Sequence, residues 1–227
     1  MDVLEETVVD LASTPVRELN KALHEAEPGS RWRVENPRGA HNVAVGIHED
    51  IRVTVEGHVG YFAAGMHQKG WLEIVGNAGT GLAENIMSGT VHVTGSTSQS
   101  TGATGHGGLI VVDGSTGARC GIAMKGVDIV VGGDIGHMSA FMAQAGRLVV
   151  CGDAGEALGD SIYEARIYVK GTVASLGADC IEKPMRDEHL AELGDLLAAA
   201  GRSDDPADFR RYGSARTLYH FHSHNTY

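Results

Sequence analysis

The segment Thr90-Val91-His92-Val93-Thr94-Gly95 and the segment Leu109-Ile110-Val111-Val112-Asp113-Gly114, which follows after 19 residues, decide the fold of this chain. In both segments two aliphatic residues alternate with other residues, and a glycine ends the run. Alternation with a period of two is typical of a β-strand that buries one face. The same line occurs seven times at the same spacing. Such a fixed, short period indicates a solenoid.

Three columns of residues carry the repeat. The first aliphatic column is Val53, Leu72, Val91, Ile110, Ile129, Leu148 and Ile167. The second is Val55, Ile74, Val93, Val112, Val131, Val150 and Val169. The glycine column is Gly57, Gly76, Gly95, Gly114, Gly133, Gly152 and Gly171. A further column of small residues, which we expect at a corner, is Ala64, Ala83, Gly102, Gly121, Ala140, Gly159 and Ala178.

The length of the repeat selects the type of solenoid. Helical-pair repeats need more than about 30 residues, whereas 19 residues suit one coil of a parallel β-helix. We find neither the six-residue sub-period of a left-handed hexapeptide β-helix nor the calcium-binding nonapeptide repeat. Since crossovers between parallel strands are right-handed by default, we predict an all-β solenoid, a right-handed parallel β-helix of about seven coils with helical caps at both ends.

The sequence outside the repeat predicts the two caps. We divide the chain into an N-terminal cap at 1–48, a β-helix at 49–184, and a C-terminal helical cap with an aromatic tail at 185–227. The open ends of a solenoid must be covered because their backbone groups are unpaired.

In the N-terminal cap we expect a strand from Thr7 to Leu11, a helix with Thr14 as its N-cap, and strands at Trp32–Val34 and Asn42–Val45. In the C-terminal cap the leucines from Leu190 to Leu197 predict a helix that Gly201 ends. Asp205-Pro206 predicts the start of a second short helix, which Gly213 ends.

Composition excludes several classes of protein. A formal net charge of −11 argues against nucleic acid or an anionic membrane as the partner. No run of 18 apolar residues predicts a membrane span, and the acidic start of the sequence lacks a signal pattern, so we expect a cytoplasmic protein. Three cysteines without a Cys-x-x-Cys pair are interpreted as free thiols, with a catalytic or cluster-binding role as the alternative.

Few residues suggest chemistry. His220, His222 and His224 alternate and form either a metal site or the polar edge of a tail. Asp160 and Asp179, 19 residues apart, would be adjacent carboxylates, which keeps a polysaccharide-cleaving site open as an alternative.

Gly76-x-x-Gly79-x-Gly81 has the letters of a phosphate loop. It lacks the strand-to-helix context of such loops, so we assign these glycines to the corners of the coils.

Five polar residues are the least well explained by the solenoid. We predict that they face a partner or ligand, with simple solvation as the alternative: Glu84, Asn85, Arg119, Lys125 and His137.

Several segments resemble a known family. Ala83–Gly89, Gly136–Gly146 and Gly159–Ala165 resemble the C-terminal β-helix (GXGXG) domain of the glutamate synthase large subunit. The flanking segments resemble stand-alone versions of that domain, best known as the small β-helix subunit of N-methylglutamate synthase; they are Asn36–His41, Ser175–Lys183 and Phe209–Arg216.

The resemblance implies a scaffold without catalytic residues, cofactor or metal of its own. It implies a hetero-oligomer with an amidotransferase-like subunit and an FMN-binding synthase-like subunit, which would hold the FMN and an iron–sulfur cluster. The sequence begins Met1-Asp2, so we expect no N-terminal cysteine nucleophile. The complex would convert methylamine and glutamate to N-methylglutamate and ammonia. An ordinary glutamine-dependent glutamate synthase subunit and an independent carbohydrate-binding or polysaccharide-active β-helix remain the alternatives.

Overall fold

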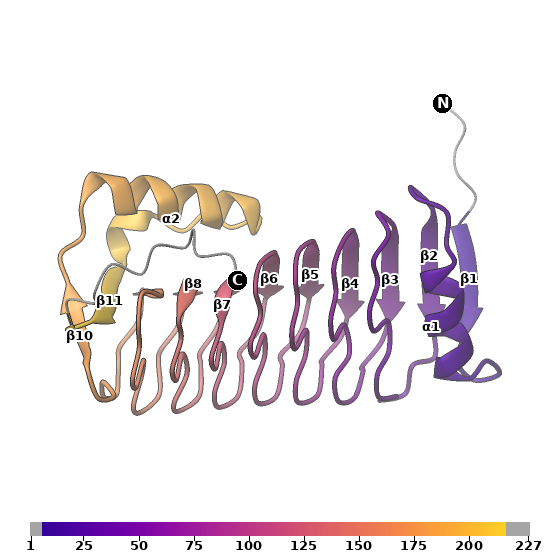
Figure 1. The fold of residues 1–227 in the computed structure, drawn as a ribbon, viewed down its shortest axis with the longest axis horizontal. Helices are drawn as coiled ribbons and strands as arrows, with labels where there is room; N and C mark the ends of the chain where they lie inside the picture. Colours follow the sequence, from indigo (N-terminus) through magenta and orange to yellow (C-terminus); the bar gives the residue numbers. More distant parts are fainter. Residues whose placement is uncertain (1–5, 217–227) are drawn as a thin grey trace, which may run out of the picture.

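The chain forms a rod of stacked coils that carry one long sheet along their side (Figure 1). The computed structural model describes residues 6–216. The strands are β1 (Glu6–Asp10), β2 (Arg31–Glu35), β3 (Arg52–Glu56), β4 (Trp71–Val75), β5 (Thr90–Val93), β6 (Leu109–Val112), β7 (Lys125–Val131), β8 (Ala145–Val150), β9 (Arg166–Val169), β10 (Cys180–Lys183) and β11 (Arg210–Ser214). Within the described residues the α-helices are α1 (Val16–His24) and α2 (Asp187–Ala199), and Pro206–Asp208 forms the 3-10 helix η1.

The register of the sheet confirms the predicted β-solenoid of about seven turns. The strands from β1 to β9 are parallel neighbours, and Val91 pairs with Ile110 as the 19-residue repeat requires. A second ladder of parallel bridges follows another side of the coils and joins Val59, Ala78, Thr97, Thr116, Ile135, Ala154 and Val173. The right-handed sense of the coil stays a prediction.

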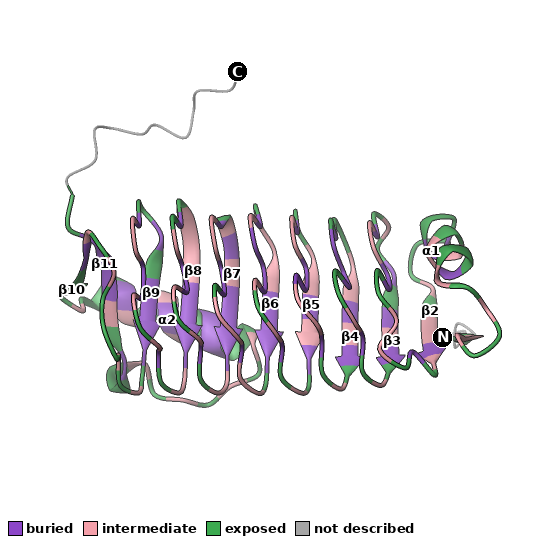
Figure 2. Ribbon diagram, turned by 90° about the horizontal axis from the view of Figure 1, so that it is seen from below, coloured by how far each residue is buried: buried purple, intermediate pink, exposed green. Residues whose placement is uncertain are grey.

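The core lies inside the coils. Every member of both aliphatic columns is fully buried, and the turns between the strands are the most exposed parts (Figure 2). Burying such side chains contributes roughly 1.5–3 kcal/mol each relative to exposure. The repeat is therefore stabilised mainly by stacked aliphatic residues within one continuous core.

The two small-residue columns have different physical origins. In the corner column, Ala64, Ala83 and Ala140 have left-handed φ angles of 57°, 53° and 56°. In the glycine column, a Cβ on Gly95 would lie 2.3 Å from Asn77 Oδ1 and 2.6 Å from the carbonyl oxygen of the glycine one coil earlier. The corner therefore needs an unusual backbone conformation, whereas the glycine column from Gly95 onward reflects the close approach of stacked backbones.

The N-terminal cap differs from the prediction at two places. Pro15, and not Thr14, precedes the first residue of α1, and no side chain caps that end. The predicted strand at Asn42–Val45 is wrong, because this segment is a turn in which Asn42 and Ala44 have φ angles of 57° and 56°. It is one more turn of the solenoid, and the offset of 21 residues from Arg31 in β2 to Arg52 in β3 hides it from the 19-residue pattern.

The C-terminal cap contains the predicted first helix but lacks the second. α2 buries Leu193 and Leu197 against the sheet, and Gly201, with φ of 70°, follows its end. After the short η1 the chain forms β11, which lies antiparallel between β9 and β10. A strand wins here because Tyr212 is 2% exposed and fills the end of the core, while β11 satisfies the edge of β9.

The last coil is one residue shorter than the others. Leu158 bridges Leu176, an offset of 18 residues, so Gly177 rather than Ala178 follows Gly159 in the corner column. For the same reason Asp160 and Asp179 do not occupy equivalent positions. The predicted pair of adjacent carboxylates in one column is therefore wrong.

Within residues 6–216, none of the helices is long and apolar enough to cross a membrane.

Candidate interaction surface

The turns between the bridge ladder and the next strand form one continuous surface, which we call the turn ridge. Its six stacked turns are residues 61–68, 80–87, 99–106, 118–125, 137–144 and 156–163. Each of them repeats left-handed φ angles at alternate positions, as Arg119 (59°) and Ala123 (51°) show. Because the conformation repeats at every coil, side chains at equivalent positions stack in rows along the rod.

All five predicted site residues lie on this ridge, but the structure does not gather them into one cluster. Glu84 and Asn85 lie on the second turn, Arg119 and Lys125 on the fourth, and His137 on the fifth. Adjacent coils are about 4.8 Å apart, so the second and fifth turns are separated by roughly 14 Å. The five residues therefore mark a surface and not a compact active site.

The individual environments of these residues differ. Asn85 has a left-handed φ of 56° and accepts a hydrogen bond from Thr104 Oγ1 at 2.6 Å, so it has a structural role between two turns. Glu84 is half-buried, whereas Arg119, Lys125 and His137 are exposed. The three exposed side chains are the ones available to a partner.

The first two turns of the ridge carry an exposed apolar cluster that sequence reasoning missed. We call Tyr61, Phe62, Met66 and Met87 the N-terminal patch; between 44% and 52% of each residue is exposed. Tyr61 stacks on the ring of His41, with centroids 4.6 Å apart. The only sequence signal was the occurrence of large apolar residues at turn positions that are small or polar in other coils.

A second apolar cluster lies on the last two turns. Met142 and Tyr163, which we call the C-terminal patch, are 43% and 44% exposed. They line a cavity of about 210 Å³ together with Ser161, Ile162, Asp179 and Arg216. Among the described residues, no exposed large apolar side chain lies on the two middle turns, where Arg119 and Lys125 occur. The ridge is thus apolar at both ends and polar between them.

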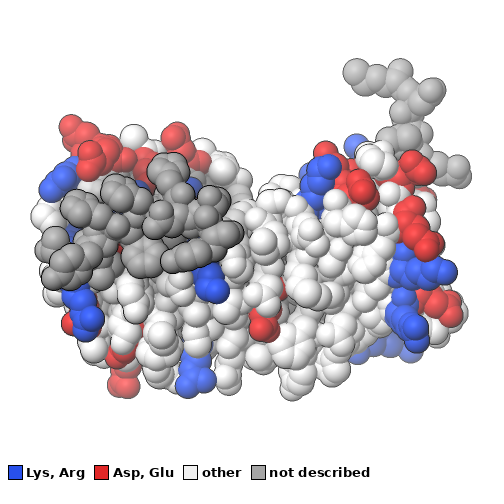
Figure 3. All heavy atoms as spheres, in the orientation of Figure 1, with Lys and Arg blue, Asp and Glu red and all other residues white. Residues whose placement is uncertain are grey.

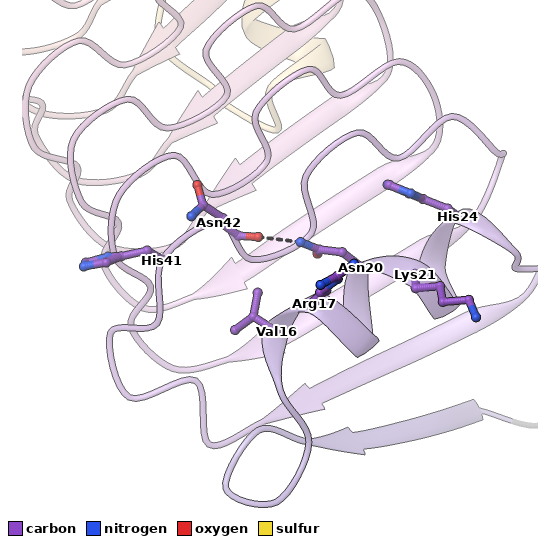
Figure 4. Close-up of a pocket in the computed structure, with 7 residues that line it drawn as sticks. All are labelled: Val16, Arg17, Asn20, Lys21, His24, His41 and Asn42. Atoms are coloured by element: carbon purple, nitrogen blue, oxygen red, sulfur yellow. Dashed lines mark hydrogen bonds between the residues drawn. The ribbon is translucent and has the colours of Figure 1, made fainter.

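A groove of about 470 Å³ between α1 and the first turn continues from the N-terminal patch (Figure 4). Asn20 from α1 donates through Nδ2 to the carbonyl oxygen of Asn42 at 2.8 Å, and its Oδ1 is buried without a partner among the described residues. His41 lines this groove and also stacks on Tyr61. The groove and the patch therefore form a joined surface at this end of the rod.

The groups that suggested chemistry have structural explanations where the structure describes them. Burial raises the pKa of Cys120 to about 12 and that of Cys151 and Cys180 to about 11, so all three remain protonated thiols. Asp160 accepts from the backbone N–H of Ala178 at 3.1 Å, and Asp179 pairs with Arg216.

A metal site is not formed by the residues that can be described. Among residues 6–216 no group of three or more His, Cys, Asp or Glu side chains is arranged to hold a metal ion. His220, His222 and His224 lie outside the described residues, so the prediction for them stays untested.

Comparison with known proteins then identifies the family. No family model matches the chain. Over 222 residues it is 58% identical to Protein GlxC of Rhizobium meliloti (strain 1021), a match that covers 96% of this chain and 97% of that protein. The chain belongs to the GlxC family. Because the similarity spans both caps as well as the coils, GlxC membership rests on more than the repeat, and it is consistent with the predicted glutamate-synthase-like subunit.

Proposed function

We propose that this GlxC-family chain is a non-catalytic scaffold subunit of a glutamate-synthase-like complex, and that the complex is an N-methylglutamate synthase. The chain would hold an amidotransferase-like subunit and an FMN-binding synthase-like subunit in register. Methylamine and glutamate would give N-methylglutamate and ammonia in those partners. FMN and an iron–sulfur cluster would belong to the synthase-like partner.

The observation that carries the proposal is the distribution of apolar side chains along the turn ridge. Exposed apolar clusters rimmed by polar residues mark protein–protein contacts. Met and aromatic residues, which make up both patches, are the types enriched in such interfaces. The ridge offers one cluster at each end, with the polar turns of Arg119 and Lys125 between them. This arrangement suits two partners held at a defined separation on a rigid rod.

The proposal is tested by co-expressing the chain with the two candidate partner subunits and separating the complexes by size. We expect Phe62→Asp with Met66→Asp to release one partner and Met142→Asp with Tyr163→Asp to release the other. Gln99→Asp, a matched control on a polar middle turn, should retain both. Binding of both partners by both double variants would contradict the assigned surfaces.

The reaction is tested separately. The assembled complex should convert methylamine and glutamate, whereas the purified chain alone should show neither a flavin spectrum nor turnover. A complex that uses glutamine and 2-oxoglutarate but not methylamine would identify the ordinary glutamate synthase instead. A flavin spectrum or turnover in the lone chain would contradict the scaffold role.

A further inference from the structure

A cavity of about 270 Å³ lies at the C-terminal end of the rod, where β9, β10 and β11 meet. Its charged lining residues are Arg166, Lys183, Arg211, Arg216 and a single carboxylate, Glu164. The chain as a whole carries a net charge of −11. Four cations around one cavity are therefore a local reversal of the overall charge.

The register of the sheet brings these cations together. Lys183 in β10 is directly opposite Arg211 in β11. Arg211 is in turn opposite Tyr168 of β9, two residues from Arg166. Like charges directly opposite each other destabilise an antiparallel pair. This arrangement costs stability unless something else compensates the charge.

The protein neutralises only half of these cations. Arg166 pairs with Glu192, and Arg216 pairs with Asp179. Within residues 6–216, neither Lys183 nor Arg211 forms an ion pair. Burial lowers the pKa of Arg211, and the nearby positive charges of Arg166 and Arg186 lower it as well.

The guanidinium of Arg211 is held in place for an additional contact. Its Nε and Nη2 donate to the carbonyl oxygen of Pro184 at 3.1 and 3.0 Å. These two bonds fix the plane of the group. They leave Nη1 without a hydrogen-bond partner among the residues that can be described.

The floor of the cavity is open because of Gly213. A Cβ at this position would meet only ordinary contacts, the nearest being the carbonyl oxygen of Ala165 at 3.7 Å and Lys183 Cγ at 3.8 Å. Gly213 also lacks a left-handed φ. Neither crowding nor backbone conformation requires glycine here, in contrast to the glycine column. Its missing side chain instead leaves room between Arg166 and Lys183.

We propose that this cavity binds a small dianion, either a phosphate ester or a dicarboxylate, with Lys183 and Arg211 as the residues that supply the uncompensated charge. Guanidinium groups bind both kinds of oxyanion through charge-assisted hydrogen bonds. The volume admits a ligand of only a few heavy atoms. The two flanking segments singled out in the sequence, 175–183 and 209–216, both contribute to this cavity. The site goes beyond the scaffold role and does not depend on it.

The test is calorimetric titration of the purified chain at low salt, with inorganic phosphate in one arm and succinate in the other. We expect one saturable site. Lys183→Gln and Arg211→Gln should each weaken binding by roughly tenfold, since each removes a charge-assisted contact. Gly213→Val should block the cavity. Arg31→Gln, which removes an exposed charge from β2 at the other end of the rod, is the matched control and should bind like the wild type.

The outcomes separate clearly. Saturation by phosphate alone assigns a phosphate ester, by succinate alone a dicarboxylate, and by both an oxyanion site of broad specificity; each supports the proposal. Absence of saturation in both arms up to millimolar concentration overturns it, as does equal weakening by Arg31→Gln, which would indicate non-specific attraction. If Gly213→Val fails to fold, the two glutamine variants with unchanged circular dichroism decide the question.

Discussion

The two halves of the sheet share the same inner face but have different outer faces. In the N-terminal half, the outward residues Thr54, Glu73 and His92 are polar and partly exposed. In the C-terminal half, the equivalent residues Val130, Val149 and Tyr168 are fully buried. α2 lies over this second half only (Figures 1 and 2).

The difference shows that the coil and its covering are specified by separate residues. The N-terminal half solvates its outer face with a polar network, in which His92 lies 3.4 Å from Glu73 and 3.0 Å from Asp113. The C-terminal half instead presents apolar residues to Leu193 and Leu197 of α2. The surface charge follows this division, with acidic side chains gathered along the α2 end in the view of Figure 3.

The largest expected effect comes from placing a charge on the covered face. Val149→Asp should lower the free energy of unfolding by about 3 kcal/mol or more, because the carboxylate would be buried beneath α2 without a partner. Thr54→Asp, at the equivalent position of the uncovered half, should cost at most about 1 kcal/mol. Chemical denaturation of both variants measures the difference, and equal losses would refute the contrast between the halves.

The glycine column should behave alike in both halves. A Cβ on Gly95 or Gly152 would lie 2.3 Å from the side-chain oxygen of Asn77 or Asp134 respectively. Alanine at either position should therefore destabilise by about 1–3 kcal/mol through overpacking. Gly194→Ala in α2 is the control, since its Cβ would meet only Pro206 Cγ at 3.5 Å. That variant should be stabilising by up to about 1 kcal/mol. A large difference between Gly95→Ala and Gly152→Ala would show that the column is not equivalent along the rod.

A smaller effect is expected from the hydrogen bond that joins α2 to the sheet. Tyr168 donates through its hydroxyl to Glu192 Oε1 at 2.7 Å. Burial raises the pKa of Tyr168, and the neighbouring carboxylate raises it further, so the hydroxyl stays protonated. Tyr168→Phe should cost about 1 kcal/mol in the unfolding transition, with α2 still in place because Glu192 keeps its pair with Arg166. An unchanged stability would mean that this bond contributes nothing.

The smallest effect concerns pH and the core of the N-terminal half. His67 is fully buried with Nδ1 unpartnered, and burial lowers its pKa below the ordinary value of about 6.5. The unfolded chain therefore binds a proton more readily than the folded one, so stability should fall as the pH decreases below about 6.5 and level off below the folded pKa. His67→Ile, which copies Ile86 of the next coil, should flatten unfolding curves measured between neutral and mildly acidic pH. An identical pH dependence in the variant would exclude His67 as the source.

Most of the coil could be predicted from the sequence, whereas the candidate surfaces could not. The alternation of Val91 and Val93 predicts an inward face wherever it occurs, because the period of a strand is local. The five predicted polar residues do lie on the turn ridge, yet the apolar patches beside them were missed. Exposure at a turn depends on how stacked corners crowd one another, and Met142 and Tyr163 follow no period that a linear pattern would show.

By itself, the sequence determined that this protein is a β-solenoid, because the 19-residue repeat of aliphatic and glycine residues specifies both strand faces and their stacking. Only the tertiary structure decided how the ends are built. β11 inserts between β9 and β10, and Lys183 thereby meets Arg211 across the sheet, although 28 positions separate them in the chain. Such pairings depend on which distant segment best covers an open edge and an unfilled core. Their partners are selected by packing in three dimensions and leave no local pattern in the sequence.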